Sequence, residues 1–190
     1  MTLPQTLAPP FPPLAWDGYA WSALVQLPTW TGMRLPDDTS LPIDGTVEVR
    51  VSTENDEPAL PSPEQAAAYE QLAAQAATVR EAILAAVFDW YQQDYLTWRD
   101  ENGYDEEEAA RYLPALTEPA QLVGLMQLTA INIFSTAKNG LSYTGYEFVC
   151  SWEEEHGLGA MLHGSRVVEV GGADTAILEW IAARDAEGTE

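Results

Sequence analysis

The chain has 190 residues, and its 30 Asp and Glu against 8 Lys and Arg give a formal net charge of −22. A surface that acidic repels nucleic acid and anionic lipid and attracts cations or basic proteins, so neither a nucleic-acid nor a membrane partner is expected. Apolar residues make up 46% of the chain, and seven Trp, eight Tyr and four Phe argue against a disordered acidic coil.

The single cysteine, Cys150, excludes an intramolecular disulfide framework and is compatible with a reducing compartment. The first residues lack the basic segment and the apolar run of a secretory signal. No stretch approaches the roughly 18 apolar residues that a membrane span needs. We therefore expect a cytoplasmic protein.

The N-terminal segment is rich in proline, with five prolines between Pro4 and Pro13. Proline fixes φ and removes a backbone donor, so residues 1–15 are predicted to form an extended arm that lies along the domain and is not a core element. A single domain is expected over residues 16–184, and residues 185–190 are expected to be a frayed acidic tail.

Strands are predicted at residues 19–27 and 45–51, where aromatic and branched residues, or valines at every second position, dominate. One long helix is then predicted to begin at Ser62, which can cap it, with Gln65 completing a capping box. The helix is expected to end within residues 91–100. Its apolar stripe is Tyr69, Leu72, Ala76, Val79, Ile83 and Val87, widened by Phe88 and Tyr91.

The acidic run after the turn at Asn102 and Gly103 is predicted to open a short helix, because carboxylates are favourable at a helix N-terminus. A further helical segment is predicted over residues 120–126. Four strands should then alternate as a meander at residues 128–137, 141–152, 159–162 and 166–170, with a hairpin turn at Asn139 and Gly140. A last helix should follow residue 174, with Ile177, Leu178, Trp180 and Ile181 as its apolar face.

Runs of strands interrupted by one long helix predict an α+β fold. The expected architecture is an antiparallel β-sheet or meander packed against a long central helix and shorter helices. Five tryptophans fall within predicted elements and are expected in the core: Trp21, Trp90, Trp98, Trp152 and Trp180.

The sequence predicts no catalytic residue and no cofactor. Cys150 has no recognised nucleophile signature around it, and its surroundings indicate a buried strand. His156 follows three glutamates, and His163 comes seven residues later, so both are candidate metal ligands. Their spacing differs from that of a helical zinc site, and a charged turn between two strands explains the same residues. No metal site is therefore predicted.

Two stretches resemble a bacterial family of unknown function. They are Trp-Glu-Glu-Glu-His-Gly-Leu-Gly at residues 152–159 and Gly-Gly-Ala-Asp-Thr-Ala at residues 171–176, and residues 103–108 are similar to the same family. Such families resemble proteins encoded beside polymorphic or contact-delivered toxins, where they act as cognate immunity proteins. The resemblance implies binding and neutralisation of a toxin domain, and it implies no catalytic residue.

The acidic charge suits a basic toxin domain, because opposite charge accelerates encounter. The candidate contact residues are Asp105, Glu106, Glu107, Glu108, Glu153, Glu154 and Glu155. Two alternatives remain open, a metal-dependent hydrolase that uses His156 and His163, and an acidic scaffold or regulatory module. Both signatures could also serve the fold alone, with Trp152 as an anchor and Gly157 and Gly159 in a turn.

Overall fold

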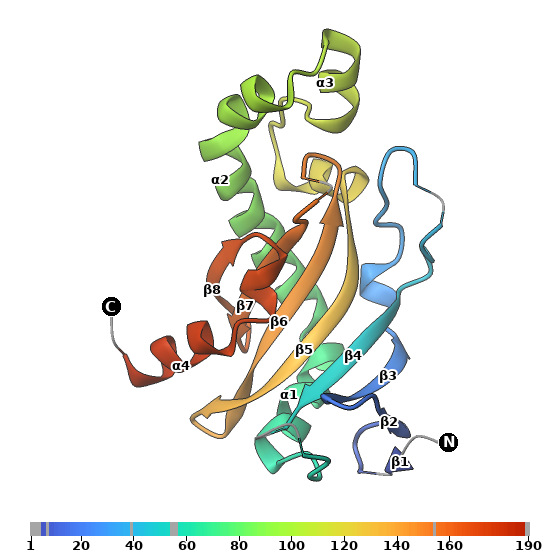
Figure 1. Cartoon of the computed structure of the whole chain (residues 1–190), viewed down its shortest axis with the longest axis vertical. Coiled ribbons are helices and arrows are strands. Elements are labelled where there is room, and N and C mark those ends of the chain that lie inside the picture. Colours follow the sequence, from blue (N-terminus) through green and yellow to red (C-terminus); the bar gives the residue numbers. More distant parts are fainter. Residues whose placement is uncertain (1–4, 7, 39, 54–56, 154, 189–190) are drawn as a thin grey trace.

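A computed structural model describes residues 5–6, 8–38, 40–53, 57–153 and 155–188. Within these residues one sheet of eight strands runs in chain order (Figure 1). Its strands are β1 (Gln5–Thr6), β2 (Leu14–Trp16), β3 (Ala20–Gln26), β4 (Thr46–Ser52), β5 (Met126–Lys138), β6 (Leu141–Cys150), β7 (Leu158–His163) and β8 (Arg166–Gly171). The meander expected in the second half of the chain is confirmed.

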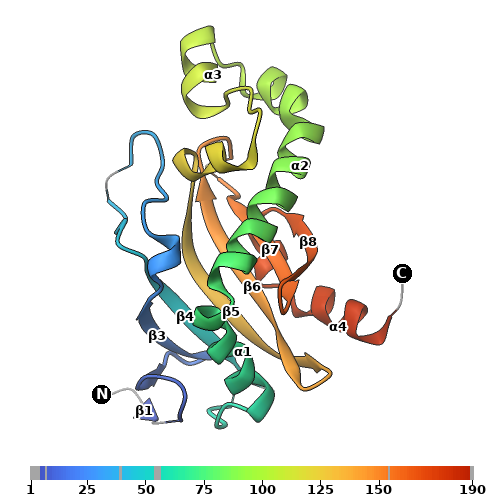
Figure 2. The ribbon, with the colours of Figure 1, turned by 180° about the vertical axis from the view of Figure 1, so that it is seen from behind.

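Helices lie on both faces of the sheet. The helices α1 (Pro63–Ala74) and α2 (Ala76–Asn102) cover one face, which Figure 2 shows from the helix side. The 3-10 helix η4 (Ala173–Ala176) and α4 (Glu179–Glu187) lie on the other face. The shorter helices of the described residues are η1 (Pro28–Trp30), α3 (Glu106–Tyr112) and η3 (Pro119–Gly124). The α+β prediction is confirmed.

One strand pair departs from the antiparallel pattern, because β4 and β5 are parallel. The segment that joins them contains α1 and α2, and parallel neighbours need a long crossover of this kind. Parallel pairing places Val49 beside Ile131 and Val51 beside Ile133, all four buried beneath the helices. The predicted antiparallel sheet is therefore confirmed for the other described strand pairs, and the parallel pair at its centre was not predicted.

The predicted start of the long helix is confirmed in detail. Ser62 Oγ accepts a hydrogen bond from Gln65 N at 3.2 Å, and Gln65 Oε1 accepts one from Ser62 N at 2.9 Å. The buried Gln65 side chain also donates to the carbonyl oxygens of Ser52 (2.8 Å) and Phe134 (3.2 Å). The cap thus joins the helix to β4 and β5.

The single long helix that we expected is two helices. Gln75 leaves helical geometry with φ −116° and ψ 13°, so α1 packs on β5 and β6 while α2 continues toward β8. The second helix also ends later than predicted, at Asn102, where Gly103 adopts the left-handed conformation with φ 63°. Glycine tolerates that conformation without a Cβ clash.

The main core lies between the sheet and the helices α1 and α2. The predicted stripe supplies five of its buried residues: Leu72, Val79, Ile83, Val87 and Tyr91. A second, smaller core lies between the sheet and α4, and it consists of Phe134, Tyr143, Met161, Ile181 and Ala182. Among the described helices none combines the length and the apolar character of a membrane span.

Both ends of the chain contribute more than predicted. Phe11 and Leu14 of the proline-rich arm are buried in the main core, and β2 pairs with β3. At the other end α4 continues to Glu187, and Asp185 accepts hydrogen bonds from Arg166 and Tyr143. The expectations of an arm outside the core and of fraying from residue 185 are therefore wrong.

The last helix also differs from its predicted apolar face. The segment first forms η4, then α4, so Ile177 lies between them and is 52% exposed. Trp180 is also 52% exposed, whereas Ile181 is buried. The guanidinium of Arg184 lies 5.0 Å from the centre of the Trp180 ring. The prediction of a core position is wrong for Ile177 and Trp180.

The predicted hairpin turn is confirmed at Asn139 and Gly140, which have φ angles of 54° and 79°. Two successive positive φ values match the twist of the flanking strands β5 and β6. The predicted helical segment over residues 120–126 is η3, and it ends earlier because Met126 begins β5.

Candidate functional site

The acidic run at residues 105–108 forms the start of α3. Asp105 Oδ1 accepts hydrogen bonds from the backbone N–H groups of Glu107 (2.8 Å) and Glu108 (2.9 Å). Glu108 Oε2 accepts one from Asp105 N at 3.1 Å, which completes a capping box. The predicted short helix is confirmed, and all four acidic residues are exposed.

The other end of α3 is fixed to two distant segments. Tyr112 Oη donates to Asp37 Oδ2 at 2.6 Å, and Arg111 forms an ion pair with the other oxygen of Asp37. Ser151 Oγ, just after β6, donates to the carbonyl oxygen of Tyr112 at 2.6 Å. These bonds join α3 to the loop after η1 and to the end of β6.

An aromatic cluster lies near α3, where α2 meets the end of β6. The ring of the buried Trp152 lies 5.0 Å from that of Tyr91 and 6.4 Å from that of Trp98. Tyr91 Oη donates to the carbonyl oxygen of Pro114 at 2.7 Å, which holds the segment after α3 against α2. The expectation that Trp152 anchors a strand end is confirmed. Rings packed in this way restrain the start of the β6–β7 turn, which follows Trp152.

The second acidic cluster lies in the turn between β6 and β7. Glu153 is half-buried, and its Oε1 lies 3.0 Å from Nδ1 of the exposed His156. Glu155 is exposed, whereas Glu154 lies outside the described residues. The backbone N–H of Gly157 donates to the carbonyl oxygen of Glu153 at 3.0 Å and closes the turn. The turn directly follows Trp152, so it is held against the aromatic cluster.

Both predicted clusters therefore lie at one end of the molecule. Figure 1 shows α3 above the connection between β6 and β7, with the loop after η1 rising at the same end. Asp37 and Asp38 of that loop were not among the predicted contact residues. The only signal was their position after Pro36, which is typical of a turn but does not specify contact with α3.

The basic residues of the chain are largely engaged in internal contacts. The basic side chains that hydrogen-bond within the described residues include Arg50, Arg111, Lys138, Arg166 and Arg184. Arg111, the basic residue of α3, is held by Asp37. The carboxylates at the start of α3 are exposed to a partner.

A hollow of about 480 Å³ opens at this acidic end. Its walls come from the loop after η1, from α3 and from the end of β6. The lining residues are Leu35, Pro36, Asp37, Asp38, Tyr112, Val149, Cys150 and Ser151. The hollow thus combines two carboxylates with an apolar side, which is an arrangement suited to a cationic group on an apolar stem.

The two candidate metal ligands do not come together. His156 precedes β7 and His163 ends it, and six extended residues span roughly 16 Å. His163 Nε2 lies 3.0 Å from the carbonyl oxygen of Lys138, and its ring packs 4.6 Å from that of Tyr143. Among the described residues no three His, Cys, Asp or Glu side chains group as metal ligands.

Cys150 is buried at the end of β6, as expected from its sequence surroundings. Burial raises the pKa of its thiol to about 12, because the protein interior disfavours a thiolate. Its Sγ lies 3.7 Å from the carbonyl oxygen of Glu153. A thiol in this state is a poor nucleophile.

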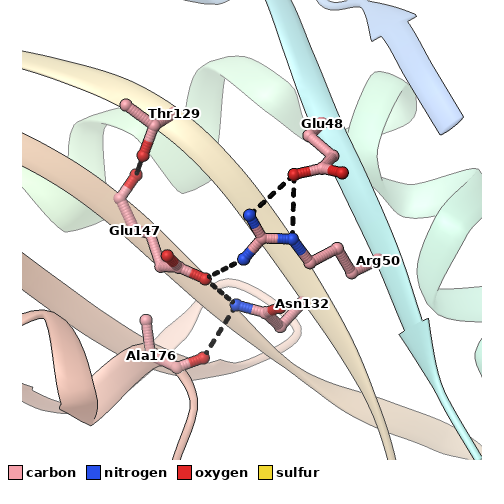
Figure 3. A network of polar contacts seen from close by, with 6 residues as sticks. All are labelled: Glu48, Arg50, Thr129, Asn132, Glu147 and Ala176. Atoms are coloured by element: carbon pink, nitrogen blue, oxygen red, sulfur yellow. Dashed lines mark hydrogen bonds and ion pairs between the residues drawn. The ribbon is translucent and has the colours of Figure 1, made fainter. Parts of the chain in front are cut away.

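A polar network joins the strands on the face opposite α2 (Figure 3). Arg50 donates to Glu48 Oε2 at 2.6 and 2.9 Å and to Glu147 Oε1 at 2.8 Å. Asn132 Nδ2 donates to the same oxygen of Glu147 at 2.6 Å and to the carbonyl oxygen of Ala176 at 3.1 Å. The guanidinium lies between two carboxylates, and the network connects β4, β5 and β6 to η4.

Beside this network, η4 packs directly on glycines of three strands. A Cβ on Gly159 of β7 would lie 2.6 Å from the carbonyl oxygen of Gly172. A Cβ on Gly145 of β6 would overlap the carbonyl oxygen of Ala176. A Cβ on Gly171, the strand partner of Gly159, would lie 2.6 Å from Thr175 Oγ1. The turn can approach the sheet only because these side chains are absent.

Both signatures therefore have roles in the fold. Residues 171–176 end β8 and build the turn that packs on the glycines, while Trp152 anchors the aromatic cluster. Gly157, with φ 60°, makes the turn before β7 as expected. Gly159 does not, because it lies within β7.

The family model described as "Domain of unknown function (DUF6985)" matches residues 27–178, which is most of the chain. The chain belongs to this family. No curated protein and no solved structure matches it. The matched span begins just after β3 and ends just before α4, so it includes α3, both acidic clusters, the polar network and η4. The resemblance to a family of unknown function is confirmed.

Proposed function

We propose that this member of the DUF6985 family is an immunity protein that binds and neutralises a basic bacterial toxin domain through its acidic end. One observation carries the proposal: α3, the β6–β7 turn and the loop after η1 are far apart in sequence, yet they lie at one end of the molecule. Tyr112 of α3 hydrogen-bonds to Asp37 of the loop and to Ser151, which directly precedes the turn.

The physical properties of this end suit protein binding. Its carboxylates are exposed, so they can attract a cationic partner over distances comparable to the Debye length, about 8–10 Å at physiological salt. The aromatic cluster around Trp152 restrains the β6–β7 turn, and the hydrogen bonds of Tyr112 restrain α3, which lowers the entropy lost on binding. Charge of this kind raises the association rate and selects the partner, while buried contacts provide most of the affinity.

The direct test is co-expression with the product of the neighbouring gene, which the proposal expects to contain a basic toxin domain. We expect growth rescue and co-purification of a complex whose association rate falls steeply as salt is added. Failure of rescue, together with no complex at low salt, would refute the pairing.

A matched pair of triple variants distinguishes the effect of charge at the acidic end from the effect of the total charge of the protein. One carries Glu106→Gln, Glu107→Gln and Glu155→Gln, which leaves the capping box of α3 intact. The control removes the same charge from exposed positions elsewhere, with Glu57→Gln, Glu70→Gln and Glu81→Gln. We expect the first variant to associate about tenfold more slowly at low salt and the control to change less than about twofold. Equal rates would contradict a role for the acidic end.

A further inference from the structure

We infer that the hollow between the loop after η1, α3 and the end of β6 receives an arginine side chain from the partner protein. The inference rests on the proposed function in one respect, namely that the partner is a basic protein. It adds the chemical group recognised and the place where that group binds.

The hollow has the size of a specific subsite. Its volume of about 480 Å³ falls within the roughly 300–1,000 Å³ of ligand pockets, so it can accept one long side chain with part of its neighbours. Leu35, Pro36 and Val149 are partly buried and form its apolar side. An aliphatic stem can pack on that side while its charged head reaches the carboxylates.

The carboxylates of the hollow differ in what they already bind. Both oxygens of Asp37 are occupied, one by Arg111 and the other by Tyr112 Oη. Asp38 Oδ1 accepts a hydrogen bond from Ser40 N at 2.7 Å. A carboxylate has about four acceptor sites, so both aspartates keep capacity for a further donor. Hydrogen bonds from Ser40 also hold the pKa of Asp38 below its ordinary value.

The contact between Arg111 and Asp37 indicates which cation suits this place. It shows a guanidinium bound to a carboxylate at the rim, with the same guanidinium 5.7 Å from the centre of the Tyr112 ring. A guanidinium is planar, forks toward a carboxylate and is less strongly hydrated than an ammonium group. These properties favour arginine over lysine for a half-apolar hollow that contains Asp38.

The test uses N-acetyl-arginine amide as the probe, and the isosteric but uncharged N-acetyl-citrulline amide as its control. In a titration of the isotope-labelled protein at low salt, we expect saturable shifts at the amides of Tyr112, Val149 and Ser151. The citrulline compound should bind at least about tenfold more weakly, because it lacks the charge-assisted hydrogen bond. Equal shifts with both compounds, or no saturable shift with the arginine compound, would overturn the inference.

Two variants and a control place the site. Asp38→Asn should lower the affinity for N-acetyl-arginine amide about threefold to fivefold, as expected for a partly exposed ion pair. Val149→Phe should fill the hollow and abolish the saturable shifts. Asp89→Asn, an exposed acid on α2, should leave the affinity unchanged. Circular dichroism confirms that each variant is folded, and unchanged binding in both Asp38→Asn and Val149→Phe would overturn the placement.

Failure of this inference can be distinguished from failure of the proposed function, because the titration contains no toxin. If the probe does not bind while the toxin complex forms, the arginine subsite is wrong and the proposed function stands. If the probe binds as expected while rescue and complex formation fail, the subsite stands and the immunity function is wrong.

Discussion

Replacing Gly159 by alanine tests whether η4 packs on the sheet as described. Gly159 has no positive φ, so alanine is free to adopt its backbone conformation and only the added methyl group matters. That methyl carbon would lie 2.6 Å from the carbonyl oxygen of Gly172 and 2.7 Å from the backbone nitrogen of Ala176. An ordinary contact begins at 3.4 Å, so η4 must retreat by about 0.8 Å.

The expected loss of stability is about 3 kcal/mol. Overpacking of a close contact costs about 1–3 kcal/mol. The retreat also strains the hydrogen bonds from Ala173 N to the carbonyl oxygen of His156 (3.0 Å) and from Asn132 Nδ2 to that of Ala176 (3.1 Å). Each contributes about 1 kcal/mol. For a chain of this length the loss corresponds to a melting temperature lower by about 10 °C.

Thermal and urea unfolding of Gly159→Ala provide the measurement, with Gly124→Ala as the control. A Cβ on the exposed Gly124 of η3 meets no atom within 4 Å, so its change should stay within about 0.5 kcal/mol. Gly145→Ala presses on the same turn, and the double variant should lose less than the sum of the two. A melting temperature of Gly159→Ala within about 2 °C of the wild type would refute the packing.

Three further predictions concern other parts of the fold. Gln65→Ala should lower the free energy of unfolding in urea by about 2–3 kcal/mol, and Ser62→Ala should lower it by about 1 kcal/mol. The difference is expected because Gln65 also donates to two strand carbonyl oxygens. Equal losses would contradict that role. The hydrogen bonds from Arg166, followed by that from Tyr143, hold the pKa of Asp185 at about 2, below its unfolded value. Its stabilisation is therefore complete above about pH 4 and lost as the pH falls toward 2, so the wild type should lose about 1 kcal/mol more than Asp185→Asn over that interval. The same pH dependence of stability in the wild type and in Asp185→Asn would argue against a stabilising role for the ionised Asp185. Finally, native Cys150 should react with an aromatic disulfide reagent at about pH 8 more than about 100-fold more slowly than in concentrated guanidinium chloride, since the buried thiol has a pKa of about 12. Comparable rates would show that the end of β6 is open.

Local signals predicted the elements of this fold well. The capping boxes at Ser62 and Asp105 and the turn at Asn139 involve atoms within four residues of each other, so the sequence contains all the groups that interact. The break at Gln75 was missed, because the apolar stripe continues through it. Only the separate packing surfaces of α1 and α2 require the helix axis to change there.

The candidate site was only half predictable. The exposure of residues 105–108 follows from their place at a helix start, and their charge follows from their residue types. Their closeness to Asp37 depends on Tyr112 and Arg111, whose partners lie more than 70 residues away. No local pattern encodes such a contact. The same holds for the network of Arg50 and Glu147, which are 97 residues apart.

The sequence by itself determined the charge, the helix caps, the alternation of the strands and the turn at Asn139, because these depend on composition or on neighbouring residues. The tertiary structure alone decided which acidic segments meet, because strand order and the parallel β4–β5 pair set the distances between them. It also separated His156 from His163 by the length of β7. Finally, it placed Gly145 and Gly159 beneath η4, where the missing side chains allow two backbones to touch.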